Sequence, residues 1–254
     1  MTWGIVPTRV VSGIYIIPMD TNPRDLRSYQ LRDQDRFFSP ERRFEDGVTL
    51  AATRREEGKY ATRDIATRAI QYLGEHVSHD DDAPFFLYLA FTAPHFPLHA
   101  LPEDIAKYKG RYDGGWDELR QERKACLKEM GLYDGELARM RPDVIAPWSL
   151  SQAELEEQID PGELGTAIPW SQLNATQREF QAEKMKVHVA MIDRMDQEIG
   201  RVMDQVAAMG ETDNTIVIFL SDNGATAEQI NRGDRHTVGA SSGSADSYLA
   251  LGPG

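Results

Sequence analysis

Apolar residues recur with helical spacing in two segments of the chain and form continuous runs in three others. Between residues 65 and 77 they repeat every three or four positions, which predicts an amphipathic helix with Thr62 as its N-cap. The same spacing predicts a longer helix over residues 185–206, which Gly210 is placed to end.

The three apolar runs predict strands. Residues 85–91 and 215–220 are apolar on both faces, which is typical of strands in the middle of a largely parallel sheet covered by helices. Residues 10–18 form a third apolar run. It is far shorter than the ~20 residues that a membrane span requires, so we predict a strand there. The alternation of helices with buried strands predicts an α/β sandwich.

A long polar stretch over about residues 104–172 interrupts this alternation. Glycines and prolines break it repeatedly, so we expect an insertion-like excursion with short helices rather than a continuation of the sheet. Insertions of this kind often face the substrate in enzymes.

The charge balance restricts the classes of partner. The chain has 28 basic and 41 acidic residues, a formal net charge of −13, which argues against nucleic acid as a partner. An anionic ligand would therefore have to be held by a local cluster of cations or by a metal ion. Cys126 is the only cysteine, so the chain forms no internal disulfide and its composition does not indicate a compartment.

Asp222 and Asn223 directly follow the second predicted buried strand. A carboxylate beside a side-chain amide offers hard oxygen ligands, which suit calcium or magnesium better than zinc. The alternative is an ordinary turn, because Asp-Asn-Gly is common turn chemistry and Gly224 can supply a positive φ.

His95 lies four residues beyond the other predicted buried strand, between Pro94 and Pro97, which restrict the loop. An imidazole held there can bind an anionic oxygen or donate a proton to a leaving group, whereas the alternative is an ordinary loop histidine. In open α/β sheets, ligands bind beyond the carboxyl ends of the strands. We therefore expect His95 and the pair Asp222-Asn223 to share a pocket at one edge of a single sheet.

Two further histidines lie near these positions in the sequence. His99 belongs to the same loop as His95 but has no strand to constrain it, and we expect it on the surface. His236 follows Asp234 and Arg235 in a loop rich in glycine and serine, where a contact with substrate is possible.

Several separated motifs resemble those of type I sulfatases, particularly bacterial arylsulfatases. The resemblance runs from about residue 60 to residue 254, and its motifs occur in the family's order. They are residues 85–100, 108–116, 191–196, 213–224 and 243–248.

The resemblance implies an alkaline-phosphatase-like α/β fold, with a mostly parallel central sheet covered by helices, and hydrolysis of small-molecule or carbohydrate sulfate esters. In that family the nucleophile is a formylglycine, and calcium and cationic side chains neutralise the sulfate oxygens. By motif position, Asp222 and Asn223 resemble the calcium ligands, and His95 resembles the histidine that contacts the sulfate group.

The chain also departs from the family pattern. It contains no Cys/Ser-x-Pro-x-Arg sequence, from which formylglycine is made, and residues 1–59 match the family poorly. We therefore expect residues 60–254 to be part of a sulfatase catalytic domain, incomplete at both ends, with no turnover by the isolated chain. Two alternatives remain: a sulfatase-fold binding or scaffold protein without catalysis, and a related metal-dependent phosphate-ester hydrolase.

Overall fold

The computed structural model divides the chain into two compact units, Met1–Ala93 with Met195–Ile216, and Pro94–Arg194 with Val217–Gly254. None of the helices in the described ranges is both long enough and apolar enough to cross a membrane. The predicted domain boundary at residue 60 stays a prediction, and much of the segment before it lies outside the described residues. The structure describes residues 12–18, 27–31, 37–38, 43–51, 58–78, 84–143, 150–225, 227 and 235–252.

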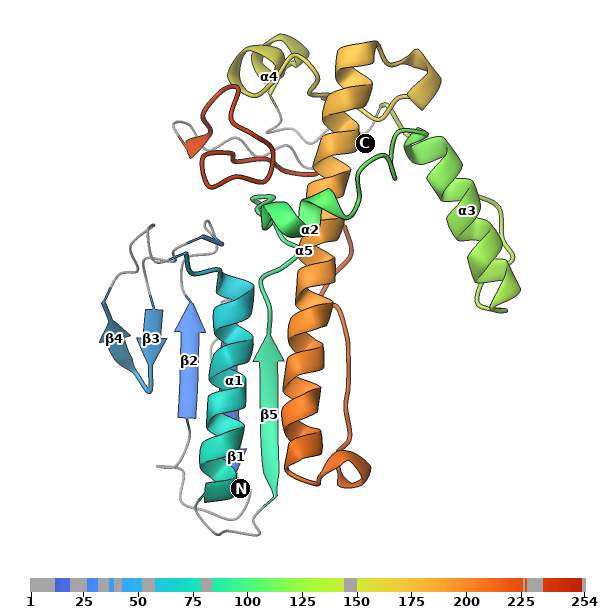
Figure 1. Cartoon of the computed structure of the whole chain (residues 1–254). Helices are drawn as coiled ribbons and strands as arrows, with labels where there is room; N and C mark the ends of the chain where they lie inside the picture. Colours follow the sequence, from blue (N-terminus) through green and yellow to red (C-terminus); the bar gives the residue numbers. More distant parts are fainter. Residues whose placement is uncertain are drawn as a thin grey trace. The chain divides into compact units, whose positions relative to one another are not determined.

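The first unit contains one five-stranded sheet in the order β4-β3-β2-β1-β5 (Figure 1). All of its strand pairs are antiparallel. The prediction of a mostly parallel sheet is therefore wrong for the strands that the structure describes. The strands are β1 (Ser12–Pro18), β2 (Arg27–Leu31), β3 (Arg43–Glu45), β4 (Val48–Leu50) and β5 (Phe85–Ala90).

A tight hairpin shows why part of this sheet is antiparallel. Asp46 and Gly47 connect β3 to β4 with φ values of 49° and 79°. Positive φ at both central residues is the conformation of a type I′ turn, for which Asp-Gly is a preferred sequence. A two-residue connection of this kind can only join antiparallel strands, because parallel neighbours need a crossover of a dozen residues or more.

The two strongest strand predictions have different outcomes. Strand β5 is confirmed, but it lies at the edge of the sheet, and Phe86 and Tyr88 are 53% and 55% exposed instead of buried. Residues 215–220 form no strand, and Ile216 and Leu220 are 90% and 71% exposed, so the prediction of a buried strand there is wrong. An apolar run forms a buried strand only where neighbouring strands and helices cover it.

Helix α1 (Ala61–Ser78) confirms the first helix prediction and packs against β1, β2 and β5 (Figure 1). The buried residues Ile65, Ala69 and Leu73 lie on one face at the predicted spacing. Thr62 is not the N-cap, because it lies inside the helix and is buried.

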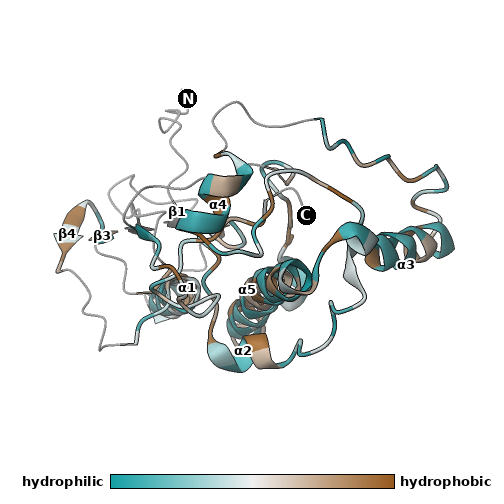
Figure 2. Ribbon diagram, turned by 90° about the horizontal axis from the view of Figure 1, so that it is seen from above, coloured by the Kyte–Doolittle hydropathy of each residue, from teal (hydrophilic) through white to brown (hydrophobic). Residues whose placement is uncertain are grey.

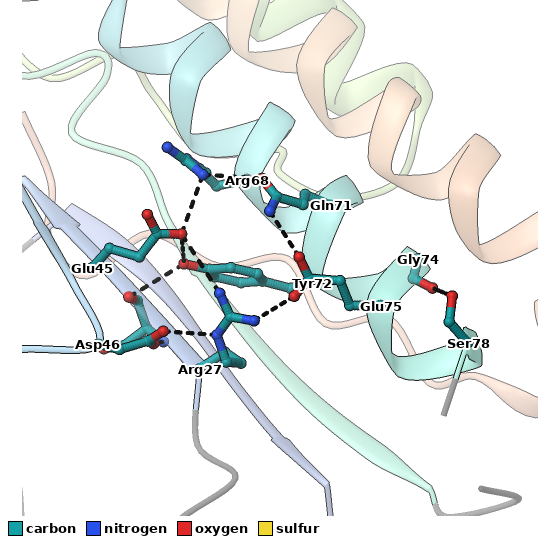
Figure 3. A network of polar contacts seen from close by, with 10 residues as sticks. Arg27, Glu45, Asp46, Arg68, Gln71, Tyr72, Gly74, Glu75 and Ser78 are labelled. Atoms are coloured by element: carbon teal, nitrogen blue, oxygen red, sulfur yellow. Dashed lines mark hydrogen bonds and ion pairs between the residues drawn. The ribbon is translucent and has the colours of Figure 1, made fainter. Parts of the chain in front are cut away.

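A polar network fastens α1 to the hairpin (Figure 3). Arg27 donates to Asp46 over 2.8 Å and also pairs with Glu75, and the Tyr72 hydroxyl donates to Glu45 over 3.0 Å. Burial and the hydrogen bond to Glu45 raise the pKa of Tyr72, so this hydroxyl remains a donor. The network therefore fixes the orientation of the helix on the sheet with charged groups that are partly exposed.

Helix α5 (Ala175–Ala208) confirms the second helix prediction and begins ten residues earlier than predicted. Gly210 has a φ of 79°, and the Glu211 N–H donates to the Val206 carbonyl over 3.2 Å. This geometry is a glycine helix end of the predicted kind.

The polar stretch at residues 104–172 contains helices, as predicted, although one of them is long. Helix α3 (Gly115–Glu129) is coloured mostly hydrophilic in Figure 2, and of its residues only Gly115 is buried. The shorter helices in and beyond this stretch are α2 (Pro102–Ala106), α4 (Gln152–Gln158), η3 (Trp170–Gln172) and η4 (Thr212–Asn214).

Two buried ion pairs lie within the second unit and involve the part of α5 that belongs to it. The fully buried carboxylate of Asp104 accepts two hydrogen bonds from Arg194, over 2.7 and 2.9 Å, and lies 2.9 Å from the Lys107 ammonium. Burial alone would raise the pKa of Asp104, but the bonds and charges of Arg194 and Lys107 outweigh it and lower that pKa. Ten residues earlier on α5, the buried Lys184 ammonium donates to Glu163 over 2.6 Å.

Candidate functional site

The loop that follows β5 carries His95 on the surface, with its ring oriented by a hydrogen bond. The Nδ1 atom lies 2.6 Å from the Phe96 carbonyl oxygen, and the two rings stack with centroids 4.3 Å apart. Because a carbonyl can only accept, Nδ1 carries the proton in this bond. The remaining nitrogen, Nε2, is therefore the atom of this ring that can bind an anionic oxygen or exchange a proton.

The rest of the loop is held by residues 243–249. The Leu98 N–H donates to the Leu249 carbonyl over 2.8 Å, and the Ala100 N–H donates to the Gly243 carbonyl over 3.1 Å. His99 is only 2% exposed, and its Nε2 donates to the Ser247 carbonyl over 2.7 Å. The expectation that His99 lies on the surface is therefore wrong, since its ring is a structural support of the loop.

Gly243 permits the close approach of this loop to its support. Its φ is +82°, and a Cβ atom built there would lie 2.8 Å from Ile105 and 3.0 Å from Val187. Both the backbone conformation and the lack of space exclude a larger residue without rearrangement. The glycine at position 243 therefore allows the loop that carries His95 to lie close to the residues that support it.

His236, in another segment, forms a hydrogen bond with the backbone of the residues that support the histidine loop. Its Nδ1 accepts from the Tyr248 N–H over 3.0 Å, so its other nitrogen carries the proton and donates to the Ile159 carbonyl over 3.2 Å. The ring is therefore held as the neutral Nε2–H tautomer. Its two nitrogens serve the backbone, which leaves neither for a substrate contact in this arrangement.

The aromatic ring of Tyr248 connects the histidine loop to this segment. Tyr248 is buried, and its ring meets that of Phe96 edge-on at 6.1 Å between centroids. The guanidinium of the exposed Arg235 lies over the same ring, 5.9 Å from its centroid. Sequence reasoning assigned no role to Tyr248, although the motif of residues 243–248 indicated that the segment matters.

Asp222 and Asn223 are exposed in a bend outside any strand. The Asn223 amide donates to the Gly224 carbonyl over 2.8 Å, and the Ser221 hydroxyl donates to the Asn223 carbonyl over 2.7 Å. Within the described part of the chain, no hydrogen bond, ion pair or ring contact joins either residue to His95. The shared edge of one sheet, on which the expected pocket depended, is not formed, because residues 215–220 are not a strand.

The donors at this bend are of the right type for calcium but too few. Calcium takes six to eight oxygen ligands, whereas Asp222 and Asn223 bring one carboxylate and one amide. No cluster of three or more potential metal-binding side chains occurs among the residues that the structure describes. The described residues therefore do not form a calcium site by themselves.

We expect the purified chain to bind calcium only weakly, with a dissociation constant above about 1 mM, since most of the oxygen ligands that a site needs are lacking. Isothermal titration of the calcium-free chain measures this directly. A tight site with one ion per chain would contradict this expectation. If the Asp222→Ala variant then lost that site, the bend would be shown to be part of a complete ligand set.

The sequence is similar to those of known sulfatases. The sulfatase family model matches residues 18–249. An uncharacterised sulfatase of Schizosaccharomyces pombe is 42% identical over 141 residues, which are 56% of this chain and 22% of that protein. An arylsulfatase of Klebsiella aerogenes is 34% identical over 148 residues, which are 58% of this chain and 27% of that protein.

A more distant relative covers more of the chain. An N-acetylglucosamine-6-O-sulfatase of Bacteroides thetaiotaomicron is 26% identical over 225 residues, 76% of this chain and 37% of that protein. Because the family model matches most of its length, this chain belongs to the sulfatase family. It spans between 22% and 37% of the length of these relatives.

Proposed function

We propose that this chain contributes one side of a sulfate-ester hydrolase site, at which His95 contacts the sulfate group. The observation that carries the proposal is the orientation of that ring. Its Nδ1–H is engaged with the Phe96 carbonyl, so Nε2 of an exposed side chain is available to an anionic oxygen. The family match over residues 18–249 supports sulfate as that anion.

The substrates we propose are small-molecule or carbohydrate sulfate esters. The names of the relatives support both classes, since one is an arylsulfatase and another an N-acetylglucosamine-6-O-sulfatase. A net charge of −13 gives no general attraction for such anions, so binding must come from local groups such as the His95 imidazole.

Asp222 and Asn223 are proposed as two of the calcium ligands of the complete site. Calcium, when bound in such a site, neutralises charge on the sulfate oxygens. The two residues provide the appropriate oxygen atoms, but they need further ligands that the described residues do not bring together. The contribution of His95 does not depend on them.

We also propose that the 254 residues bind a sulfate ester without hydrolysing it. The sequence has no Cys/Ser-x-Pro-x-Arg motif, and hence no residue from which the formylglycine nucleophile could be made. With 4-nitrophenyl sulfate, we expect saturable binding by titration calorimetry and no release of 4-nitrophenol. His95→Asn should weaken binding about tenfold, because it removes a hydrogen bond to a charged group.

His76→Asn, a replacement of a histidine on α1, is the matched control and should leave binding unchanged. Robust release of 4-nitrophenol would contradict the absence of a nucleophile, and binding that survives His95→Asn would refute the role of His95. Hydrolysis of 4-nitrophenyl phosphate in preference to the sulfate would favour the phosphate-ester alternative.

A further inference from the structure

A row of side chains in the second unit leads from His95 to the cationic side chain of Arg235. The His95 ring stacks on Phe96 at 4.3 Å, the Phe96 ring meets Tyr248 at 6.1 Å, and the Arg235 guanidinium lies 5.9 Å from the centre of Tyr248. Both ends of the row, His95 and Arg235, are exposed, whereas Tyr248 is buried. An aromatic core thus separates two positions that can bind anions.

The row is anchored at each step, which fixes its order. The Tyr248 N–H donates to Nδ1 of His236, the residue next to Arg235, so residues 235–236 are fastened to the ring that Arg235 covers. The loop of His95 is fastened to the same segment through the bond from Leu98 to Leu249. The separation of His95 and Arg235 is therefore set by backbone contacts as well as by ring contacts.

We propose that Arg235 is a specificity-determining residue that binds a second anionic group of the substrate while His95 contacts the sulfate. This inference rests on the proposed role of His95. The ligand class that these two residues would recognise is a sulfate ester with a carboxylate or second sulfate at its far end. Arginine suits that group because its planar guanidinium can form two parallel hydrogen bonds to a carboxylate.

The charge of the chain strengthens the inference. With 41 acidic residues against 28 basic ones, a ligand with two negative charges is repelled by most of the surface. Such a ligand can bind only where cations are grouped, and the row places an exposed arginine and an exposed histidine on two contacting segments.

The test compares matched pairs of probes on the whole chain, by calorimetry at low salt and about pH 6. Phenyl sulfate is paired with 4-carboxyphenyl sulfate, and biphenyl-4-yl sulfate with its 4′-carboxy derivative, which gives two spacer lengths. We expect the carboxylated probe of at least one pair to bind about fivefold to tenfold more tightly than its parent.

Arg235→Gln should abolish this preference and leave binding of the parents, which lack the carboxylate, unchanged, while Arg235→Lys should retain part of it. Arg139→Gln makes the same change of charge at another exposed arginine and should keep the preference. A merely structural Arg235 would not alter the preference, since loss of packing weakens both members of a pair.

The possible results separate the two proposals. A wild-type chain without the preference, an Arg235→Gln variant that keeps it, or an Arg139→Gln variant that loses it would each overturn the role of Arg235. If the role of Arg235 fails but His95→Asn still weakens the binding of every probe, the proposed function remains supported. If His95→Asn affects none of them, the proposed function fails and the inference fails with it.

Discussion

Replacing Lys184 with methionine is expected to destabilise the chain by about 3–5 kcal/mol, because it leaves the Glu163 carboxylate buried without its countercharge. The Lys184 ammonium is fully buried and donates to Glu163 over 2.6 Å and to the Leu251 carbonyl over 2.9 Å. Gln181 also donates to Glu163, over 3.1 Å, but a neutral amide cannot replace the lost charge. Urea-induced unfolding followed by circular dichroism measures the change.

A double variant separates two contributions to the free energy of unfolding: the penalty for leaving one buried charge unpaired, and the net contribution of the intact ion pair. Lys184→Met with Glu163→Leu removes both charges and should recover most of the loss, since apolar side chains of similar volume can replace a buried ion pair. Lys124→Met is the matched control, because Lys124 pairs with an almost fully exposed Glu136, and it should change little. A Lys184→Met variant as stable as the wild type would show that the Glu163 carboxylate is not buried as the structure has it.

The elements that could be predicted from the sequence are those whose signal is local. Helices α1 and α5 were predicted because their apolar residues repeat at helical spacing, and Gly210 because a helix end of that type needs a positive φ. Strand β5 was predicted from a run of apolar residues. Its position at an edge was not, because the order of strands depends on segments far away in the sequence.

Residues 215–220 show the limit of that reasoning. An apolar run indicates that a segment can be buried, but burial requires neighbouring elements on both faces of the sheet. In the structure the same run forms no strand and is largely exposed, with Phe219 74% accessible to solvent. The expected pocket therefore stays a prediction without its structural basis, since Asp222 and Asn223 were placed by reference to a strand that is not there.

The support of the histidine loop was beyond local reasoning for a different reason. His99 is separated by 148 positions from its partner Ser247, and nothing in the residues around His99 indicates that contact. The pairing of Asp104 with Arg194 spans 90 positions. Such polar contacts are specified by tertiary packing, so only the structure could show that these polar side chains are buried.

Replacing Asp104 with asparagine is the second change with a large expected effect, a loss of about 3 kcal/mol near neutral pH. The substitution keeps the shape of the side chain but removes the charge to which Arg194 donates two hydrogen bonds and near which Lys107 lies. The buried Arg194 guanidinium would then lose the charge that compensates for its burial. Chemical unfolding of the two proteins at pH 7 gives the difference.

The loss should also depend on pH in a direction set by the lowered pKa of Asp104. A carboxylate whose pKa is lower in the folded chain stabilises it above its unfolded pKa of ~3.9, and the stabilisation disappears as pH falls through the folded value. The difference between wild type and Asp104→Asn should therefore be constant above about pH 5 and shrink below about pH 4. Asp143→Asn, at an exposed pair with Arg141, should leave stability nearly unchanged. A difference that stayed constant down to pH 2 would show that the charge of Asp104 contributes nothing.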